Sequence, residues 1–369
     1  MTAFIHQLPR WPAFHWDGHR IAAPLATVRH QQGRLLGRME SLGPITRQQI
    51  LLQTLSEDVL KTSEIDGEQL DPEQVNSSIA RRLGLDYANV PYIDPHVDGV
   101  VDVILDATAN YPDPLTADRL FAWHTALFSA TSIGMKIIRV GGLRTDQNGT
   151  VQAAAGSIGR QRALLRAPAA SRLNSEVDTF LRWFQGSDNT DWVIKAAIAH
   201  LWLVTIHPFD AGNGRIARAV ADLALARSEE THQRFYSISA QIREESDAYW
   251  TILEQTQKGW LDITPWLEWF LACMSRAISG AQQTLSRVLA RTRFWDSVAH
   301  FPLNPRQRLV IARLLDGSEG KLTSGQWAKL ANCSHDTSLR DISALLAWGL
   351  LTRSAESGRN TSYTLVQAP

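Results

Sequence analysis

The stretch HPFDAGNGRIAR, residues 207–218, joins two segments that have the composition of buried helices. The segment before it, KAAIAHLWLVTI, is apolar almost throughout, and the segment after it, AVADLALARS, is rich in alanine, which favours helix. Gly212, Asn213 and Gly214 can expose backbone N–H groups at the start of the second helix, where unpaired amides and the helix dipole attract anions. The stretch therefore predicts an anion-binding turn, with a helix corner that binds nothing as the plainer alternative.

Three side chains of this turn indicate which anion and which chemistry. Arg215 and Arg218 are three residues apart, which brings both guanidinium groups to one face of the helix, an arrangement that suits a polyphosphate. His207 stands directly before the turn, and a neutral imidazole can accept the proton of a hydroxyl. Together they predict transfer of a phosphate-linked group from a nucleotide to a hydroxyl.

Composition limits the class of protein. The 369 residues exceed what one hydrophobic core usually serves, and a net charge of zero gives no general attraction to nucleic acid or membranes. Two cysteines are too few for a disulfide framework and indicate a reducing compartment. The start of the sequence, interrupted by Pro9 and Pro12, does not resemble a secretion signal. We expect a cytoplasmic protein of several domains that does not enter a membrane.

Helical periodicity recurs along the chain and strand-like alternation is scarce, so we predict a mainly α protein. The predicted helices cover residues 44–65, 94–111, 116–128, 172–185 and 190–206, the last of them apolar on all sides and therefore central. Residues 136–156 are the exception, because Gly141-Gly142 and Asn148-Gly149 separate short β-prone pieces. This segment predicts a hairpin or flap.

The C-terminal part has the element order of a winged helix. Three short helices, over residues 304–317, 323–333 and 336–349, precede two strands around a polar tip. From residue 303 onward there are eight Lys or Arg and five Asp or Glu, fewer cations than a basic stripe for nucleic acid contains. Arg353 and Arg359 are the candidate DNA contacts, and a structural or target-selecting role is the alternative.

The stretch HPFDAGNGRIAR resembles His-Pro-Phe-x-acid-Gly-Asn-Gly-Arg-x-x-Arg, the signature of the Fic family, whose members mostly transfer AMP from ATP to a hydroxyl of a target protein. RWPAFHWD and GRLLGRMESLG near the start, GGLRT and SIGR in the middle, and the winged-helix tail resemble one bacterial branch of that family. The resemblance implies a Fic-type helical core with a β-hairpin flap, a helical N-terminal region and a C-terminal winged-helix domain. The expected divisions are an N-terminal region with an inhibitory helix, the Fic core, a linker helix and the winged helix, over residues 1–95, 96–280, 281–302 and 303–369.

The resemblance also implies roles for individual residues. His207 would be the general base, and Phe209 would anchor the turn. The α- and β-phosphates of ATP would lie on Gly212, Asn213, Gly214 and Arg215, with the γ-phosphate on Arg218. A flap over residues 141–154, including Val151 and Gln152, would clamp the target protein. Tyr249 and Trp250 stand where relatives carry aromatics near the nucleotide, although core packing explains them equally well.

At one position the sequence departs from the signature. The family's acid, which binds the Mg²⁺ or Mn²⁺ that bridges the phosphates, falls on Ala211, and the nearest carboxylate is Asp210. Alanine offers no oxygen ligand, and neighbouring side chains point in different directions. Ala211 therefore predicts weakened activity, and Asp210 is the substitute metal ligand only if the turn is rearranged.

Upstream, TSEIDG at residues 62–67 resembles the family's inhibitory motif, with Asp66 in place of its glutamate. The resemblance implies that Asp66 pairs with Arg218 and obstructs the γ-phosphate. The alternative is an exposed acid at a helix C-terminus that Gly67 ends.

These observations predict a protein adenylyltransferase, a nucleotidyltransferase that is autoinhibited by an N-terminal helix and weakened by Ala211. Its partners would be a target protein and, as further candidates, DNA and a second copy of the chain. A low-turnover, nucleotide-sensing DNA-binding regulator and an enzyme that removes AMP from modified proteins are the alternatives.

Overall fold

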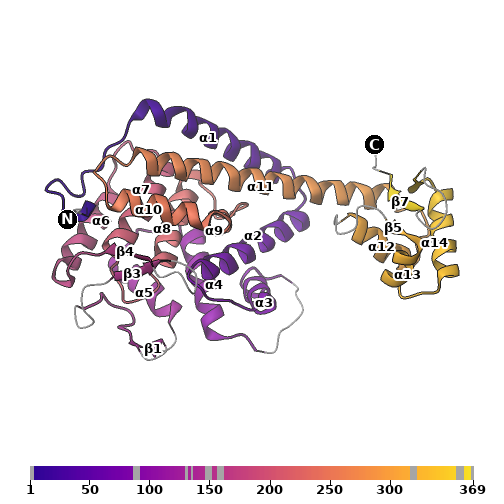
Figure 1. Ribbon diagram of the computed structural model, residues 1–369, viewed down its shortest axis with the longest axis horizontal. Helices are drawn as coiled ribbons and strands as arrows, with labels where there is room; N and C mark the ends of the chain where they lie inside the picture. Colours follow the sequence, from indigo (N-terminus) through magenta and orange to yellow (C-terminus); the bar gives the residue numbers. More distant parts are fainter. Residues whose placement is uncertain are drawn as a thin grey trace. The chain divides into compact units, whose positions relative to one another are not determined.

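The computed structural model describes residues 4–85, 92–128, 132–133, 136–145, 152–155, 162–315, 322–354 and 361–366. The chain divides into two compact units, Met1–Gln282 and Gln283–Pro369. Both units are largely helical, as Figure 1 shows, which confirms the mainly α prediction. Among the described residues, no helix combines the length and apolar character that crossing a membrane requires.

Helices α1 (Gly18–Glu40), α2 (Pro44–Ile65) and α3 (Pro72–Arg82) form the N-terminal part. α2 begins with Pro44 in its first turn and ends at Asp66, where Gly67 adopts a left-handed φ of 86°. α3 begins at Asp71, whose carboxylate accepts a hydrogen bond from the backbone N–H of Glu73. These local signals fix where α2 stops and how the chain leaves it toward α3.

The five helices that position the candidate site are α4 (Pro95–Ala109), α5 (Ala117–Leu127), α6 (Leu173–Gln185), α7 (Trp192–Ile206) and α8 (Asn213–Glu229). Every residue of α7 after Trp192 is buried, as its uniformly apolar sequence predicts. α7 and α8 pack on each other, and α8 also packs on α4. α5 is capped by Thr116, whose hydroxyl accepts a hydrogen bond from the N–H of Arg119.

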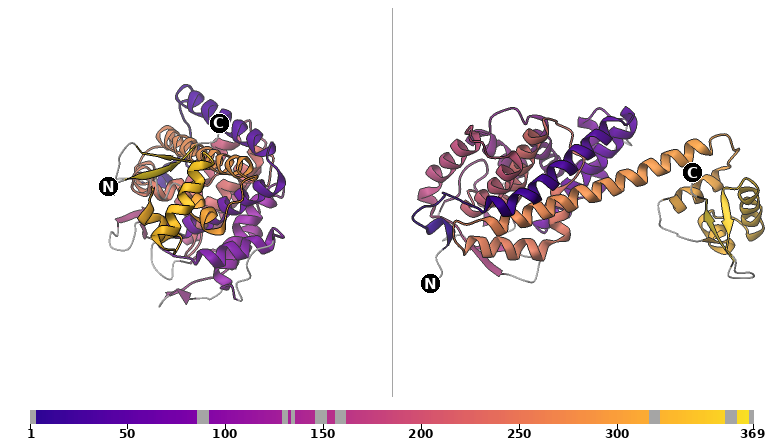
Figure 2. Two further views of the ribbon diagram at one scale, coloured as in Figure 1. Left: turned by 90° about the vertical axis from the view of Figure 1, so that its right-hand side faces the viewer. Right: turned by 90° about the horizontal axis from the view of Figure 1, so that it is seen from above.

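The remaining helices of the first unit are η1 (Ile5–Gln7), η3 (Ala170–Arg172), α9 (Ile238–Glu244), α10 (Ser246–Gln257) and α11 (Thr264–Ser297). α11 continues from the first unit into the second and includes most of the expected linker helix. Within the first unit α1 and α11 lie side by side (Figure 2), joined by an ion pair of 2.6 Å between Arg20 and Glu268.

The predicted flap region contains antiparallel hairpins, and their strands extend beyond residues 136–156 on both sides. β1 (Ser132–Ile133) pairs with β2 (Lys136–Ile137), and β3 (Gln152–Ala155) pairs with β4 (Arg162–Arg166). Gln152 begins β3, and Val151 lies outside the described residues. After β2, the backbone N–H of Arg139 donates to Asp210 at 2.8 Å, and that of Gly141 donates to Nδ1 of His124 at 3.0 Å.

The second unit contains α12 (Pro305–Leu315), β5 (Leu322–Thr323), α13 (Ser324–Leu330), α14 (His335–Ala347), β6 (Leu351–Arg353) and β7 (Ser362–Leu365). The strands form one sheet in the order β5-β7-β6, and Trp327 and Leu345 are fully buried in the unit's core. The helices and the final hairpin follow the predicted order, and β5 is an addition that the sequence did not indicate. Arg359 lies outside the described residues.

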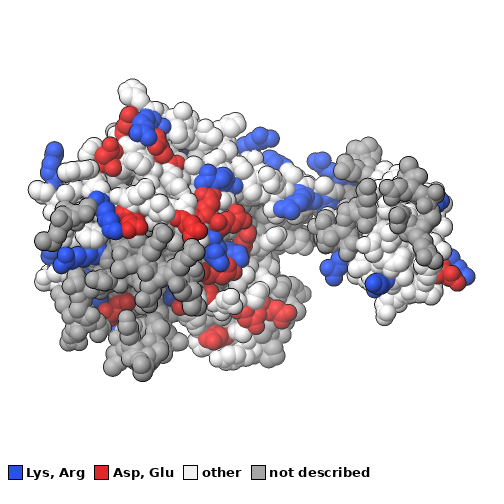
Figure 3. Space-filling view, in the orientation of Figure 1, with Lys and Arg blue, Asp and Glu red and all other residues white. Residues whose placement is uncertain are grey.

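Charge is distributed unequally between the units. Residues 283–369 contain eleven Lys or Arg and six Asp or Glu, in a chain whose total charge is zero. Asp341 is buried and paired with Arg306 at 2.9 Å, so this acid is neutralised within the unit. On the face shown in Figure 3, Lys and Arg predominate among the described residues of this unit.

Candidate functional site

The turn between α7 and α8 is held by its own side chains. His207 ends α7 in a left-handed conformation (φ 50°, ψ 62°), and its N–H binds the carbonyl of Leu203 at 3.0 Å. Asn213 receives a hydrogen bond from the N–H of Phe209 at 2.9 Å and donates one to its carbonyl at 2.8 Å. The Phe209 ring is fully buried and stacks on His124 with centroids 4.4 Å apart. Asn213 therefore shapes the turn with its side chain and can offer a ligand only its backbone N–H.

Gly212 is required at the point where α8 begins. Its φ of 72° is left-handed, and an added Cβ would lie 2.9 Å from an edge carbon of the Phe128 ring. The next residue, Asn213, is the first of α8, so the unpaired amides of the helix start follow directly. This is the geometry that the sequence predicts for an anion site.

His207 is fixed through its backbone and is neutral at physiological pH. Arg144 donates from Nε to the His207 carbonyl at 2.7 Å, and its own N–H binds the Pro208 carbonyl at 2.9 Å. Burial, together with the charge of Arg144, lowers the pKa of His207 to about 4. A neutral imidazole at this position can accept a proton.

Both arginines of the turn are buried and already bind carboxylates. Asp66 binds Arg218 at 3.1 Å through one oxygen and Arg215 at 3.2 Å through the other. Thr62 accepts two further hydrogen bonds from Arg218, at 2.6 Å on its hydroxyl and 2.9 Å on its carbonyl. The carboxylate of Asp66 lies 2.9 Å from the place where a Cβ on Gly214 would stand. The end of α2 thus places a negative group directly against the first turn of α8.

Glu68 and His96 also belong to this site, and the sequence did not single them out. Glu68 binds both terminal nitrogens of Arg215, at 2.9 and 3.0 Å, and contacts His96 Nε2 at 2.9 Å. The Arg215 guanidinium also lies over the ring of Phe128. No motif or spacing marks Glu68, which follows the helix stop at Gly67. Its partner Arg215 is 147 residues away, and only the fold brings the two together.

Asp210 is the carboxylate of the turn that the sequence offers as a metal ligand. One oxygen of Asp210 accepts a hydrogen bond from the Arg139 N–H at 2.8 Å, and Ala211 supplies no side-chain oxygen. Among the described residues, no group of three His, Cys, Asp or Glu side chains could hold a metal ion. Through this hydrogen bond Asp210 connects the turn to the segment that follows β2.

Of the two roles considered for Tyr249, a contact with the nucleotide or packing in the core, the structure has it packed in the core. It is 1% exposed, and its hydroxyl lies 2.9 Å from Nε2 of His200. Burial raises the pKa of Tyr249 and lowers that of His200 to about 3, so both groups stay neutral. Trp250 is partly exposed and contacts the Tyr249 ring.

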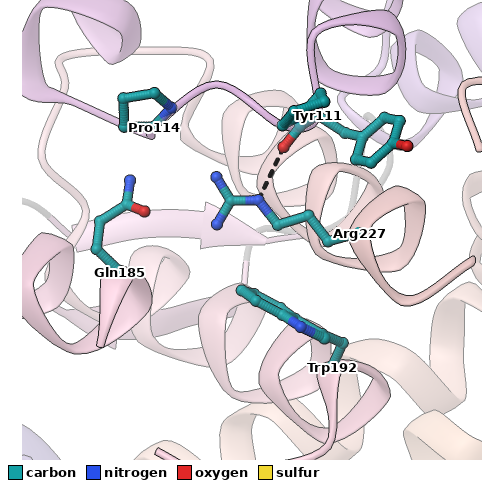
Figure 4. A pocket seen from close by; sticks show the side chains of 6 residues that line it. Tyr111, Pro114, Gln185, Trp192 and Arg227 are labelled. Atoms are coloured by element: carbon teal, nitrogen blue, oxygen red, sulfur yellow. Dashed lines mark hydrogen bonds between the residues drawn. The ribbon is translucent and has the colours of Figure 1, made fainter. Parts of the chain in front are cut away.

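The described residues of the first unit line cavities both beside the turn and away from it. One, of about 430 Å³, adjoins the turn through Arg144 and is lined by Phe121, Arg139, Gly141–Thr145, Ala170 and Asn174. The other, of about 370 Å³, is drawn in Figure 4 and lies between Gln185, Trp192 and the Tyr111–Pro114 segment. Its Arg227 lies over Trp192 and donates to the carbonyls of Tyr111 and Asp113, both at 2.8 Å. Through these hydrogen bonds Arg227 holds the segment between α4 and α5 in place.

Two family models match the chain. A model of the Fic/DOC family matches residues 114–225, which include His207 and Arg218, and a model of a domain of unknown function (DUF4172) matches residues 4–85. "Protein adenylyltransferase Fic" from Nematostella vectensis is 31% identical over 113 residues, which are 30% of this chain and 25% of that protein. The match thus spans about a quarter of that relative's length.

A solved structure that covers nearly the whole chain resembles it in fold. The crystal structure of a Fic family protein from Desulfovibrio desulfuricans G20 has a TM-score of 0.55 and 18% identity, covering 96% of this chain and 98% of that one. A Fic domain containing signalling protein from Bacteroides thetaiotaomicron has a TM-score of 0.48 and 16% identity, covering 71% of this chain and 96% of that one.

Proposed function

Since residues 114–225 of this chain belong to the Fic/DOC family, we propose that it is a protein adenylyltransferase restrained by Asp66. In the reaction, a Ser, Thr or Tyr hydroxyl of a target protein attacks the α-phosphorus of ATP. The bond from that phosphorus to the oxygen of the β-phosphate breaks, and pyrophosphate leaves. The observation that carries the proposal is the meeting of a neutral histidine, a helix start and two buried arginines within one turn.

His207 takes the hydroxyl proton in this proposal. Its depressed pKa keeps the ring unprotonated, and nearby phosphates would raise that pKa toward the pH at which proton transfer is efficient. The bond from Arg144 to its carbonyl and the left-handed backbone position the ring. Burial against Arg144 therefore prepares the base before the nucleotide arrives.

The phosphates occupy the start of α8. Backbone amides from Gly212 to Gly214 donate to them, and Arg215 and Arg218 neutralise the charge that develops as pyrophosphate leaves. Both arginines are at most 5% exposed, so water screens their charge weakly. A buried cation pair of this kind favours a multiply charged ligand over a single carboxylate.

Asp66 restrains the enzyme because its carboxylate holds the same two arginines. ATP must displace it before the phosphates can bind productively. Asparagine or glycine at this position would release the restraint, because neither carries the charge that pairs with Arg218.

The target protein approaches through the flap in this proposal. Strand β3, which starts at Gln152, would add main-chain hydrogen bonds to an extended target segment, with Val151 next to it in the sequence. The 430 Å³ cavity beside Arg144 offers room for a target side chain next to the turn.

A role for the second unit in DNA binding is the alternative that one observation favours. Its excess of cations persists after Asp341 is neutralised by Arg306, and Arg340 is exposed on α14. Retarded migration of genomic fragments that depends on ATP would support a nucleotide-sensing regulator, whereas unchanged migration with and without ATP would remove this alternative.

The adenylyltransferase proposal is tested with ATP labelled at the α-phosphate. The protein is incubated with this ATP, Mg²⁺ or Mn²⁺ and a cell lysate, beside the variants Asp66→Asn and Asp66→Asn with His207→Ala. We expect labelled protein with Asp66→Asn and none when His207 is also replaced. Equal labelling by the two variants would overturn the assignment of His207.

A further inference from the structure

Glu68 binds Arg215 in the manner of a bound phosphate. Two parallel contacts of 2.9 and 3.0 Å join its carboxylate oxygens to the two terminal nitrogens of the guanidinium. Bidentate pairs of this kind are the strong form of the arginine–carboxylate interaction. Asp66 reaches Arg215 only through Nε, at 3.2 Å, so the terminal nitrogens that a phosphate would use belong to Glu68.

His96 supports Glu68 from α4 through two contacts that both need a proton. Its Nδ1 lies 3.1 Å from the carbonyl of Leu127, and its Nε2 lies 2.9 Å from a Glu68 oxygen. A carbonyl and a carboxylate both accept hydrogen bonds, so both ring nitrogens must donate. Only the imidazolium form carries two N–H groups, and His96 therefore completes this arrangement as a cation.

We propose that Glu68 is a second gate of the phosphate site, acting on Arg215 independently of Asp66, and that it closes fully only while His96 is doubly protonated. The inference rests on the proposed nucleotide site. The inference adds a residue outside the TSEIDG motif, and it makes nucleotide access depend on pH through His96.

The direction of the pH dependence follows from the two groups. Its hydrogen bond to Glu68 raises the pKa of His96 against the effect of burial, so its support is present at lower pH and is lost as pH rises through that raised value. Burial alone would raise the pKa of Glu68, but His96 and Arg215 lower it. The gate also opens when pH falls through that lowered value, and it is closed between the two.

The groups around this cluster come from the end of α2, from α8 and from α5. Glu68 follows α2, Arg215 lies on α8, and Asp66 shares Arg215 from the end of α2. α5 contributes the Leu127 carbonyl, together with His124, whose pKa is lowered to about 4 mainly by burial and which is therefore neutral. His96 is thus the group of this cluster whose positive charge is lost as pH rises through its raised pKa.

The test measures ATP binding by calorimetry in the Asp66→Asn background, where the first restraint is absent. Adding Glu68→Gln should tighten binding about tenfold, the scale of one charge-assisted contact. As pH rises through the raised pKa of His96, affinity should rise in Asp66→Asn and change less when Glu68→Gln is added. Glu64→Gln in the same background is the matched control, because Glu64 pairs with Lys61 and Arg243 and touches neither arginine of the turn.

A second readout does not depend on nucleotide. Histidine ring NMR of the full chain should show that Glu68→Gln lowers the pKa of His96, and that Glu64→Gln leaves it unchanged. An unchanged His96 pKa in Glu68→Gln, or equal ATP affinity with and without that change, overturns the gate and leaves the proposed function standing. If no variant binds ATP, the proposed function fails and the gate with it.

Discussion

Replacing Asp66 with asparagine should tighten ATP binding about thirtyfold, because each tenfold change in affinity is about 1.4 kcal/mol and the displaced contacts are worth about 2 kcal/mol. Asp66 makes one contact to each arginine, at 3.1 and 3.2 Å, and its side chain is 21% exposed. Hydrogen bonds to charged groups contribute about 1.5–3 kcal/mol, and partial exposure places this carboxylate toward the lower end of that range. In the native protein, ATP must break both ion pairs of Asp66 before it binds the arginines. In the Asp66→Asn variant these ion pairs are absent.

The substitution leaves the arginines supported. Arg218 keeps both hydrogen bonds to Thr62, and Arg215 keeps its bidentate pair with Glu68. We therefore expect Asp66→Asn to fold normally, which circular dichroism checks.

Calorimetric titration of ATP into the native protein, Asp66→Asn and Glu64→Gln gives the three dissociation constants. An affinity in Asp66→Asn equal to that of the native protein would refute the reasoning. Asp66 would then be a helix-terminal acid whose removal affects stability alone.

Three further predictions concern the turn itself. His207→Ala should abolish AMP transfer and leave the dissociation constant of ATP unchanged, since the phosphates bind elsewhere; weaker ATP binding in calorimetry would contradict this separation. Ala211→Asp should strengthen Mg²⁺-dependent transfer by adding an oxygen ligand, and labelling no greater than that of the parent at any Mg²⁺ concentration would count against the family role of this position. Gly212→Ala should lower the melting temperature, since a left-handed alanine costs about 1–2 kcal/mol and its Cβ would crowd Phe128 at 2.9 Å; Gly280→Ala, with open space around it, is the control, and equal melting temperatures would contradict the argument.

The helices that frame the site could be predicted because their signals are local. Apolar periodicity placed α2, and a uniformly apolar composition placed α7 at the centre. The strand pairing in the flap could not be predicted, because strands of two to five residues are too short to show a clear alternation of apolar and polar residues. Within residues 138–145, backbone N–H groups donate hydrogen bonds to Asp210 and His124, and no sequence pattern predicts these bonds.

The candidate site was predictable where its residues adjoin in sequence. His207 and the arginines could be read from twelve positions, and Asp66 from its resemblance to a motif. Glu68 and His96 could not be predicted as site residues. Glu68 belongs to the site because it binds Arg215, and His96 is oriented by the Leu127 carbonyl, and both of these partners lie far away along the chain. The role of the Asn213 side chain could not be predicted either. An asparagine can bind a ligand, but here its side-chain amide is hydrogen-bonded to the backbone N–H and carbonyl of Phe209.

The most direct measurement of the central claim compares ATP labelled at the α-phosphate with ATP labelled at the γ-phosphate, using Asp66→Asn and a cell lysate. The account predicts that protein acquires the α label and none of the γ label, and that His207→Ala removes the signal. Protein labelled from the γ position, or α labelling that survives His207→Ala, would contradict it.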